Sequence, residues 1–494
     1  MLKIYNTLGK KLEEFKSYNP DLVTIYVCGP TVYHYLHVGN FRGPVFFNFV
    51  RNWIETLGYK VHYSLNFTDV EDKIIKRALE EKRSPLELSE FYIEEYKKDF
   101  ASLGLRSQDA NPKVTEHMPE IISMISELVE KKKAYSVLVE PDSSDVNFSI
   151  SEFPDYGKLS GRKPDEMLSG SRIEIDKKKK NPLDFALWKS AKQGEISWPS
   201  PWGPGRPGWH IECSAMIKAL YGKQIDIHGG GLDLMFPHHE NEMAQSEGCT
   251  GTEFVKYWMH WNMINFDGAK MSKSVGNIIS LREFLKSQHP EIYKWMMLSV
   301  HYRSPVEFGE EAIDRAIAGL ARIYSALSMA EAIYTEGITF ADKSKFTEDK
   351  KYEADLLNSW TEIEKALNDD FGTPAAFAVM FDVIRQFNTK NKRGMKLNPT
   401  TQSQCFQFMT FIKKFGKLMS LFQEPAVEFL TALDNQLLLK SGFNRSAIDL
   451  LVQERAASRA AKDFAKSDEL RKRLTEMNIA VSDLANGSFW EVVK

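Results

Sequence analysis

The sequence predicts an α/β protein with a doubly wound parallel sheet, an insertion within that sheet, a helical bundle and a small C-terminal module. Apolar, strand-like runs at 23–27 and 61–67 alternate with helical patterns, which is typical of a parallel sheet. At 494 residues the chain is longer than one hydrophobic core usually supports, so several domains are expected. From residue 311 onward apolar residues recur every three or four positions, which predicts packed helices.

The sheet is expected to occupy residues 1–115 and to resume over 206–248. Residues 116–205 form an insertion between those two parts, because turn-forming residues crowd this stretch, most densely at Trp198–Gly208. Proline at that density predicts an ordered but irregular loop. Three further regions are expected along the chain: 249–310 with a basic loop, 311–425 as the bundle, and 426–494 as the terminal module.

Composition excludes several classes of protein. The formal net charge of −3 gives no overall positive field, so any contact with RNA must come from local basic patches. No apolar run reaches the roughly 18 residues that a membrane span needs, and the first residues lack a secretory signal. Four scattered cysteines indicate reduced thiols rather than a disulfide framework. We therefore expect a soluble, cytoplasmic protein that does not contact a membrane.

Four side chains from distant segments form a candidate metal site: Cys28, Cys213, His238 and Glu242. Cys28 ends an apolar run and precedes a Gly-Pro breaker, which places it at the carboxyl edge of the sheet, where ligands bind in open α/β folds. His238 and Glu242 are four residues apart and would share one face of a helix that begins at Pro237. The structural alternatives are a buried apolar thiol and a surface His/Glu pair, and Cys249 and Cys405 are interpreted as such buried thiols.

Two short motifs are candidates for phosphate binding. His37-Val-Gly39-Asn40 leads from a loop into a long helical pattern, and a helix start offers free N–H groups and a positive dipole end to an anion. A histidine at that point is otherwise often a helix cap. Lys270-Met-Ser-Lys273-Ser combines lysines, serines and nearby glycines in a loop suited to a triphosphate, although an exposed basic turn has the same composition.

These motifs carry a resemblance to a known family. Lys270–Ser274 matches in full the KMSKS signature of class I aminoacyl-tRNA synthetases, and His37–Asn40 resembles their HIGH signature with Asn in place of the final His. Within that class the chain most closely resembles the cysteinyl-tRNA synthetase family, through Cys28–Tyr33, Asn66–Lys73, Gly203–Met216 and Asp226–Ser246. The likeness weakens after the lysine loop and returns at Leu367–Pro374 and Lys462–Arg471.

The resemblance implies a Rossmann-like catalytic domain, a connective insertion, a tRNA stem-contact region over 249–310 and an anticodon-binding module over 426–494. It also implies a cysteine–tRNA ligase, in which L-cysteine and ATP form cysteinyl-adenylate and pyrophosphate before cysteine passes to the 3′ end of tRNA-Cys. One Zn²⁺ per subunit would bind the substrate thiolate, and Mg²⁺ would accompany ATP. Zinc prefers the soft thiolate to a serine hydroxyl, and this difference would select the substrate. A monomer is expected.

The resemblance assigns roles to individual residues of this chain. The catalytic residues would be His37, Asn40, Lys270 and Lys273. ATP would contact Lys273, His37, Asn40, Gly39, Gly229, Gly230 and Asp233, and a tight structural turn is the alternative for these glycines. The cysteine pocket would include Thr68, Trp209 and His228, any of which is otherwise plain core. The zinc ligands would be Cys28, Cys213, His238 and Glu242.

Contacts with RNA are expected only near the C-terminus. Runs of like charge are usually solvated faces, and the lysine runs at 131–133 and 177–180 are interpreted in that way. The last residues include Trp490, which is expected to be exposed and able to stack on a base. The expected RNA contacts are a late basic cluster of Arg455, Arg459, Lys462, Lys466, Arg471, Lys472 and Arg473.

Two other functions are compatible with the same motifs. A cysteine ligase that acts on an amino-sugar shares the zinc and ATP motifs but lacks a C-terminal RNA-binding part, so the long region after residue 311 favours tRNA. A catalytically silent paralogue that only binds RNA would be expected to lose signature lysines or metal ligands. All of them are present in this sequence.

Overall fold

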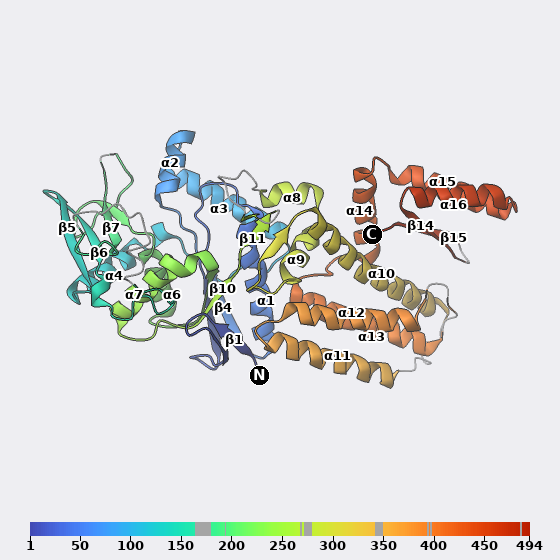
Figure 1. Ribbon diagram of the computed structural model, residues 1–494, viewed down its shortest axis with the longest axis horizontal. Helices are drawn as coiled ribbons and strands as arrows, with labels where there is room; N and C mark the ends of the chain where they lie inside the picture. The colour runs from blue at the N-terminus through green and yellow to red at the C-terminus, as the bar shows by residue number, and fades with distance from the viewer. Residues whose placement is uncertain are drawn as a thin grey trace.

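The computed structural model describes residues 1–163, 179–192, 194–266, 269–270, 279–340, 349–392, 395, 398–484 and 487–494. Three parts follow one another along the longest axis of the molecule (Figure 1). The insertion lies at one end and the central sheet in the middle. The helical bundle and the terminal module lie at the other end.

The central sheet is parallel, as the sequence predicts. Its strand order is β10-β9-β3-β4, and Ile25 in the middle of β3 lies opposite Tyr63 on one side and Ile227 on the other. These strands are largely buried, which explains why they appear in the sequence as apolar runs. The sheet extends past the expected boundary at residue 248, because its last strand follows that point. The bounds are β3 Leu22–Val27, β4 Lys60–Leu65, β9 Ile225–Gly231 and β10 Val255–Trp261.

Helices and a short hairpin surround this sheet. The buried helix α1 (Arg42–Thr56) connects β3 to β4. Helix α3 (Pro85–Ser102) begins with a capping box in which Ser84 and Glu87 satisfy each other's backbone amides, and proline occupies its first position. The remaining elements of this region are β1 Lys3–Asn6, β2 Lys11–Glu14, α2 Asp72–Glu81, α6 Ile211–Tyr221 and α7 Glu240–Thr250.

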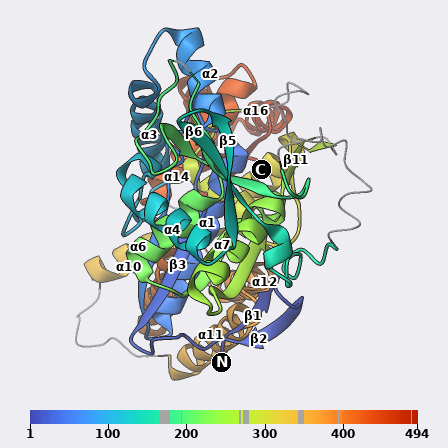
Figure 2. The same cartoon turned by 90° about the vertical axis from the view of Figure 1, so that its left-hand side faces the viewer.

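The insertion is an antiparallel sheet with one covering helix. Its strand order is β5-β6-β7-β8, and its side chains form a second hydrophobic core together with α6 and α7. Turned by 90°, the molecule presents this insertion to the viewer (Figure 2). The proline-rich stretch is ordered, since Trp198 pairs with Gly205 at the start of the last strand. The bounds are α4 Met118–Glu130, β5 Ala134–Glu140, β6 Ser143–Phe148, β7 Phe185–Ser190 and β8 Gly205–Pro207.

A small sheet carries the start of the lysine loop. Strand β11 (Ile264–Phe266) pairs in parallel with β13 (Val306–Phe308) and antiparallel with β12 (Ala269–Lys270). The described chain stops at Lys270 and resumes at Ile279, so Lys273 lies outside the described residues. Two helices, α8 (Leu281–Ser287) and α9 (Pro290–Leu298), link this loop to the second parallel strand.

The helical region begins at residue 310 and shares one continuous hydrophobic core with the central sheet. Helix α1 contacts the end of the bundle directly, because Asn48 donates to Ser420 Oγ at 2.9 Å and Asn52 to the Leu418 carbonyl at 3.0 Å. Among the described residues, Glu310–Thr335 of the first helix is long and apolar enough to cross a membrane, but 61% of its apolar window is buried, as in a core helix. The bounds are α10 Glu310–Phe340, α11 Lys350–Asn368, α12 Thr373–Lys390 and α13 Pro399–Met419.

The terminal module joins the bundle through its first helix. Phe429 of that helix stacks on Tyr324 of α10 with ring centroids 3.8 Å apart, so its first half belongs to the bundle core. A small separate core gathers only from Leu438 onward, and the module therefore begins later than residue 426 in packing terms. The bounds are α14 Ala426–Lys440, α15 Arg445–Ala460, α16 Phe464–Glu476, β14 Ile479–Leu484 and β15 Gly487–Val492.

The expectation that Trp490 is exposed is wrong. The side chain is 8% exposed and belongs to the small terminal core. Its Nε1 donates to Asp449 Oδ1 at 2.8 Å, and the Arg445 guanidinium lies 4.4 Å from its ring centroid. The residues near the end of a chain are often exposed, but strand β15 packs back onto α15. A base therefore has no free indole face to stack on here.

Trp490→Ala is consequently expected to loosen the module rather than to remove a base contact. Truncation of a buried tryptophan costs about 3 kcal/mol or more. Hydrogen exchange of the β14 and β15 amides should accelerate accordingly. Leu450→Ala, at a residue that is 66% exposed on α15, is the control and should change stability by less than about 0.5 kcal/mol. Unchanged exchange in the Trp490 variant would contradict the packing role.

Candidate functional site

The four candidate metal ligands come together at the carboxyl edge of the central sheet. Cys28 directly follows β3, and Cys213 lies in the first turn of α6. His238 belongs to the turn Met235–His239, and Glu242 to the first turn of α7. All four ligand atoms lie within 4.8 Å of one another, and all four residues are buried. Segments more than 180 residues apart in sequence thus form one group of sulfur, nitrogen and oxygen donors.

The distances within this group are short. Cys213 Sγ lies 3.7 Å from Cys28 Sγ and 3.7 Å from His238 Nε2. His238 Nε2 is 2.8 Å from Glu242 Oε1. The expected helix start at Pro237 is slightly early, because Phe236 has extended backbone angles and the regular helix begins at Glu240. His238 and Glu242 still meet, since the turn that contains His238 leads directly into α7.

A second histidine fixes the other oxygen of the carboxylate. His228 Nε2 lies 2.8 Å from Glu242 Oε2, and His228 is fully buried on β9 against the ring of Trp258. Burial alone raises the pKa of Glu242, but His228 and His238 outweigh it and hold that pKa well below its usual range. His228 therefore orients Glu242, and together with Cys28, His239 and Glu242 it also forms a second group of possible metal donors that lie within 4.8 Å of one another. Its expected place in the cysteine pocket stays a prediction.

The two thiols share a hydrogen bond, and this bond affects them in opposite directions. Accepting it lowers the pKa of Cys213 to about 7, whereas burial raises the pKa of Cys28. Cys213 also lies at the positive end of the α6 dipole, which favours a thiolate. A metal ion binds the thiolate form of cysteine, so the Cys213 side of the pair is already prepared for coordination.

A cleft of about 410 Å³ opens in front of the metal group. It runs from the end of β3 past the His37 turn to the end of β9. Trp209 forms part of its wall, with its ring centroid 4.3 Å from that of His238 and 39% of its surface exposed. Residues of the metal, nucleotide and cysteine groups line this one cleft: Cys28, His37, Gly39, Asn40, Trp209 and Asp233.

The turn at His37 is a capped short helix, Val38–Phe41. His37 Nδ1 accepts from the Gly39 amide at 3.1 Å, and Asn40 Oδ1 accepts from the His37 amide at 3.1 Å. The alternative reading of His37 as a cap is therefore correct for one of its nitrogens. The turn also contacts the chain that follows the lysine loop, because the Val38 amide donates to the Ile279 carbonyl at 3.0 Å. Two segments that are more than 200 residues apart in sequence thus meet at Val38 and Ile279.

Comparison with known proteins decides the family. Residues 14–318 match the catalytic-domain model of class I (C) tRNA synthetases, and residues 362–423 match the DALR domain. The chain belongs to the class I (C) tRNA synthetase family. The cysteine–tRNA ligase of Bdellovibrio bacteriovorus is 63% identical over 100% of both chains. That of Thermodesulfovibrio yellowstonii is 43% identical over 99% of both.

Solved structures show the same fold at low identity. A methionyl-tRNA synthetase of Mycobacterium tuberculosis in complex with methionyl-adenylate has a TM-score of 0.61 at 14% identity, over 82% of this chain and 91% of that chain. A putative arginyl-tRNA synthetase from Campylobacter jejuni has a TM-score of 0.53 at 14% identity, over 83% and 94%. The Rossmann-like sheet with a helical C-terminal region, predicted from the sequence, is therefore confirmed.

Two glycines of this class I synthetase are explained by packing. A Cβ on Gly229 would lie 2.2 Å from Phe47 Cζ, and one on Gly230 would lie 2.3 Å from His239 Cε1. Neither residue lines the cleft, and it is Gly231 that does so. The glycines thus allow α1 and His239 to approach the end of β9. Thr68 lies nearby and donates to Glu212 Oε2 at 3.3 Å.

The sequence did not reveal a chain of buried histidines behind the metal group. His239 Nδ1 lies 2.8 Å from His260 Nε2, and His260 Nδ1 lies 2.9 Å from Thr7 Oγ1 in the N-terminal segment. Burial lowers the pKa of His260 to about 3. The adjacent pair His238-His239 was the available signal for these buried histidines. Successive residues of a turn point in different directions, so His239 was free to contact partners other than those of His238.

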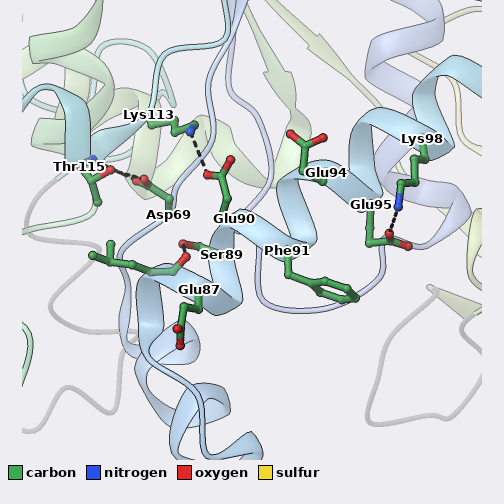
Figure 3. Close-up of a pocket in the computed structure, with 11 residues that line it drawn as sticks. Asp69, Glu87, Ser89, Glu90, Phe91, Glu94, Glu95, Lys98, Lys113 and Thr115 are labelled. Atoms are coloured by element: carbon green, nitrogen blue, oxygen red, sulfur yellow. Dashed lines mark hydrogen bonds and ion pairs between the residues drawn. The ribbon is translucent and has the colours of Figure 1, made fainter.

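A second hollow of the synthetase, about 640 Å³, lies along α3 and has a different chemistry (Figure 3). Its acidic side chains are partly neutralised, because Lys113 pairs with Glu90 at 2.9 Å and Lys98 with Glu95 at 2.7 Å. Carboxylates repel phosphate, so this hollow suits a nucleotide less well than the cleft at His37 does. None of the predicted site residues lines it.

The buried histidines predict how stability depends on pH. His260 stays neutral in the folded chain, whereas in the unfolded chain its pKa returns to about 6.5 and it takes up a proton as the pH falls. Its stabilising contribution is therefore complete above pH 6.5 and declines below it. The free energy of unfolding should fall by roughly 1.5 to 2 kcal/mol between pH 6.5 and pH 5 from this residue alone.

Urea unfolding at each pH measures that dependence. His260→Gln should flatten it by the stated amount, even though the variant is less stable at pH 8 because it loses buried hydrogen bonds. His34→Gln, at an exposed histidine of the same protein, is the control and should leave the slope unchanged. Equal slopes for the His260 variant and the unaltered chain would mean that the histidine is not buried as a neutral group.

Proposed function

We propose that this chain is a cysteine–tRNA ligase, which activates L-cysteine with ATP and Mg²⁺ and transfers it to the 3′ end of tRNA-Cys. One observation carries this proposal. Two thiols, a histidine and a carboxylate converge at the cleft that also holds the His37 turn. A metal group and a nucleotide motif in one cleft suit an amino acid whose side chain is itself a thiol. We further propose that the chain acts as a monomer.

The donor set fits zinc. Zinc at about 2.3 Å from each sulfur of a tetrahedral site holds two thiolates about 3.8 Å apart. The observed separation of Cys28 and Cys213 is 3.7 Å. Cys28 Sγ lies 3.4 Å from Glu242 Oε1, so the carboxylate faces the same point as the thiols. Zinc held by this group would favour the thiolate of cysteine over the hydroxyl of serine.

The chain's own residues would prepare the cysteine side of the cleft. His228 holds Glu242 Oε2, which leaves Oε1 to face Cys28 and His238 and would make the carboxylate a single-oxygen donor. Trp209 covers His238 and would shield the substrate side chain from water. Such supporting contacts usually change metal affinity by 10- to 100-fold. We propose Thr68 as a further residue of the cysteine pocket.

The nucleotide side of the cleft is proposed to bind ATP. His37, Gly39 and Asn40 would face the triphosphate from the capped turn, and Asp233 would lie near the nucleoside. Lys270 and Lys273 would offset the charge that develops as pyrophosphate leaves, which is where a catalytic cation contributes most. Gly229 and Gly230 would act indirectly, because they let α1 and His239 pack under this wall.

The helical region is proposed to bind tRNA. Part of the expected basic cluster has another role, since Arg455 is buried and pairs with Asp483 at 2.7 Å. Arg459 pairs with the same carboxylate. The basic residues that remain exposed on or beside α16 are the better candidates for phosphate contacts: Lys462, Lys466, Arg471, Lys472 and Arg473.

An amino-sugar ligase is the second candidate function. The matched DALR domain and the full-length similarity to proteins named cysteine–tRNA ligase weigh against it. A silent paralogue is disfavoured because all four candidate ligands are present and assembled. The amino-sugar ligase predicts a different acceptor and the silent paralogue predicts no activation, so exchange and charging together separate the three functions.

Cysteine-dependent exchange of pyrophosphate into ATP should be observed, followed by charging of tRNA-Cys. Shape alone discriminates such isosteres by only about 100-fold. Because selection by zinc would add to this, serine at the same concentration should give more than about 100-fold less exchange than cysteine. A chain that ends at Lys440 keeps the whole bundle core and should retain exchange while charging falls. Exchange without charging by the full chain would favour the amino-sugar acceptor. No exchange at all would favour the silent paralogue.

Cobalt substitution tests whether the metal contacts the substrate. With cobalt in place of zinc, added cysteine should strengthen the sulfur-to-metal charge-transfer band and added serine should not. Cys28→Ser should weaken metal retention and cysteine binding together. Cys405→Ser is the matched control, since Cys405 is a buried free thiol in α13. If cysteine is activated while the cobalt spectrum stays the same, the metal is structural.

A further inference from the structure

Arg42 is a buried cation whose hydrogen-bond acceptors, among the described residues, are backbone carbonyls. It is the first residue of α1, directly after the capped turn at His37, and it is 1% exposed. Its Nη1 donates to the carbonyls of Asn262 at 2.5 Å and Met263 at 2.8 Å. Its Nη2 donates to those of Tyr302 at 3.1 Å and Ser304 at 2.6 Å. None of the described carboxylates forms an ion pair with it.

These carbonyls belong to the starts of two paired strands. Asn262 and Met263 immediately precede β11, while Tyr302 and Ser304 precede β13. The two strands pair in parallel, with Ile264 opposite Val306. One guanidinium group therefore holds the two segments that lead into these strands. Strand β11 also pairs antiparallel with β12, which ends at Lys270, the first lysine of the signature loop.

The segment before β13 is held from its other side as well. Tyr302 Oη donates to Asp370 Oδ1 at 2.8 Å, and Arg303 Nε donates to Asp370 Oδ2 at 2.7 Å. Asp370 lies between α11 and α12 of the bundle. Arg42 thus fixes the side of this segment that faces the cleft. Arg42, Asn262 and Met263 all line that cleft, so a shift of these contacts would move its wall directly.

Arginine is suited to this position in a way that lysine is not. Its planar fork presents donors in fixed directions, and here each terminal nitrogen holds a different strand. A lysine ammonium is a single point with three rotatable donors, so it cannot span both segments with the same geometry. Burial lowers the pKa of Arg42 to about 10, which still leaves it charged at neutral pH. The side chain therefore stays charged while buried, and the carbonyls compensate for the cost of removing that charge from water.

We propose that Arg42 is a positioning residue for adenylate formation, which sets the His37 turn against the paired strands that lead to Lys270. This inference rests on the proposed function for its effect on rate. The structural part of the inference, the anchoring of β11 and β13 by Arg42, does not depend on the proposed function. Misplacement of reacting groups by about 1 Å can cost about 100-fold in rate, so loss of the fork should affect turnover more than cysteine binding.

The test compares Arg42→Lys and Arg42→Gln with Arg51→Lys. Arg51 is the matched control, because it is a buried arginine of the same helix that binds Ser107, Asp109 and Glu55 instead. In cysteine-dependent pyrophosphate exchange, kcat should fall about tenfold for Arg42→Lys and about 100-fold for Arg42→Gln. The KM for cysteine should stay within twofold, and bound zinc should not change. Arg51→Lys should keep kcat within twofold.

Hydrogen exchange provides a readout that does not depend on activity. Amides of β11 and β13 should exchange faster in Arg42→Lys, while those of β3 should not change. Unchanged exchange in both strands, or an unchanged kcat in both Arg42 variants, would overturn the proposal. So would loss of zinc together with a raised KM for cysteine in Arg42→Lys, since that pattern indicates a general folding role. Inactivity of the unaltered chain would instead count against the proposed function alone.

Discussion

The buried carboxylate of Glu242 is the constraint on which the surrounding structure depends. A charge out of contact with water costs several kcal/mol unless partners compensate for it. His228 holds one oxygen and His238 the other, each at 2.8 Å. These three residues lie on β9, on the turn after it and on α7, so the positions of strand, turn and helix are all fixed by this one group.

The same constraint reaches the rest of the cleft. The contact of His228 with Glu242 fixes the position of β9. Strand β9 can approach α1 closely only because Gly229 leaves room for Phe47. Helix α1 begins at the capped turn that contains His37 and Asn40. The metal group and the nucleotide motif are therefore connected through packed backbone rather than through a flexible link. A substitution that shifts β9 or α1 would therefore move both the metal group and the nucleotide motif.

Local patterns in the sequence predicted the fold and named four side chains that the structure brings together. Alternating apolar runs located β3 and β4, and the strand-end position of Cys28 together with the spacing of His238 and Glu242 indicated the metal group. What stayed hidden depends on contacts between distant segments. The carbonyl cage of Arg42 has no local signature, and the His239–His260 pair has only the adjacent residues His238 and His239 as a signal. Trp490 was misjudged because the packing of a terminal hairpin cannot be read from its own residues.

The shared core of sheet and bundle has a consequence for how the molecule can move. Side chains of the sheet, of α1 and of α10 to α13 pack as one body, so the bundle cannot swing relative to the cleft without breaking hydrophobic contacts. The seven buried residues of the last core, by contrast, form a unit with little apolar area of its own. The chain beyond Leu438 is therefore the part that can change position to fit a large ligand. The bundle is rigidly attached to the sheet and sets the distance between that part and the cleft.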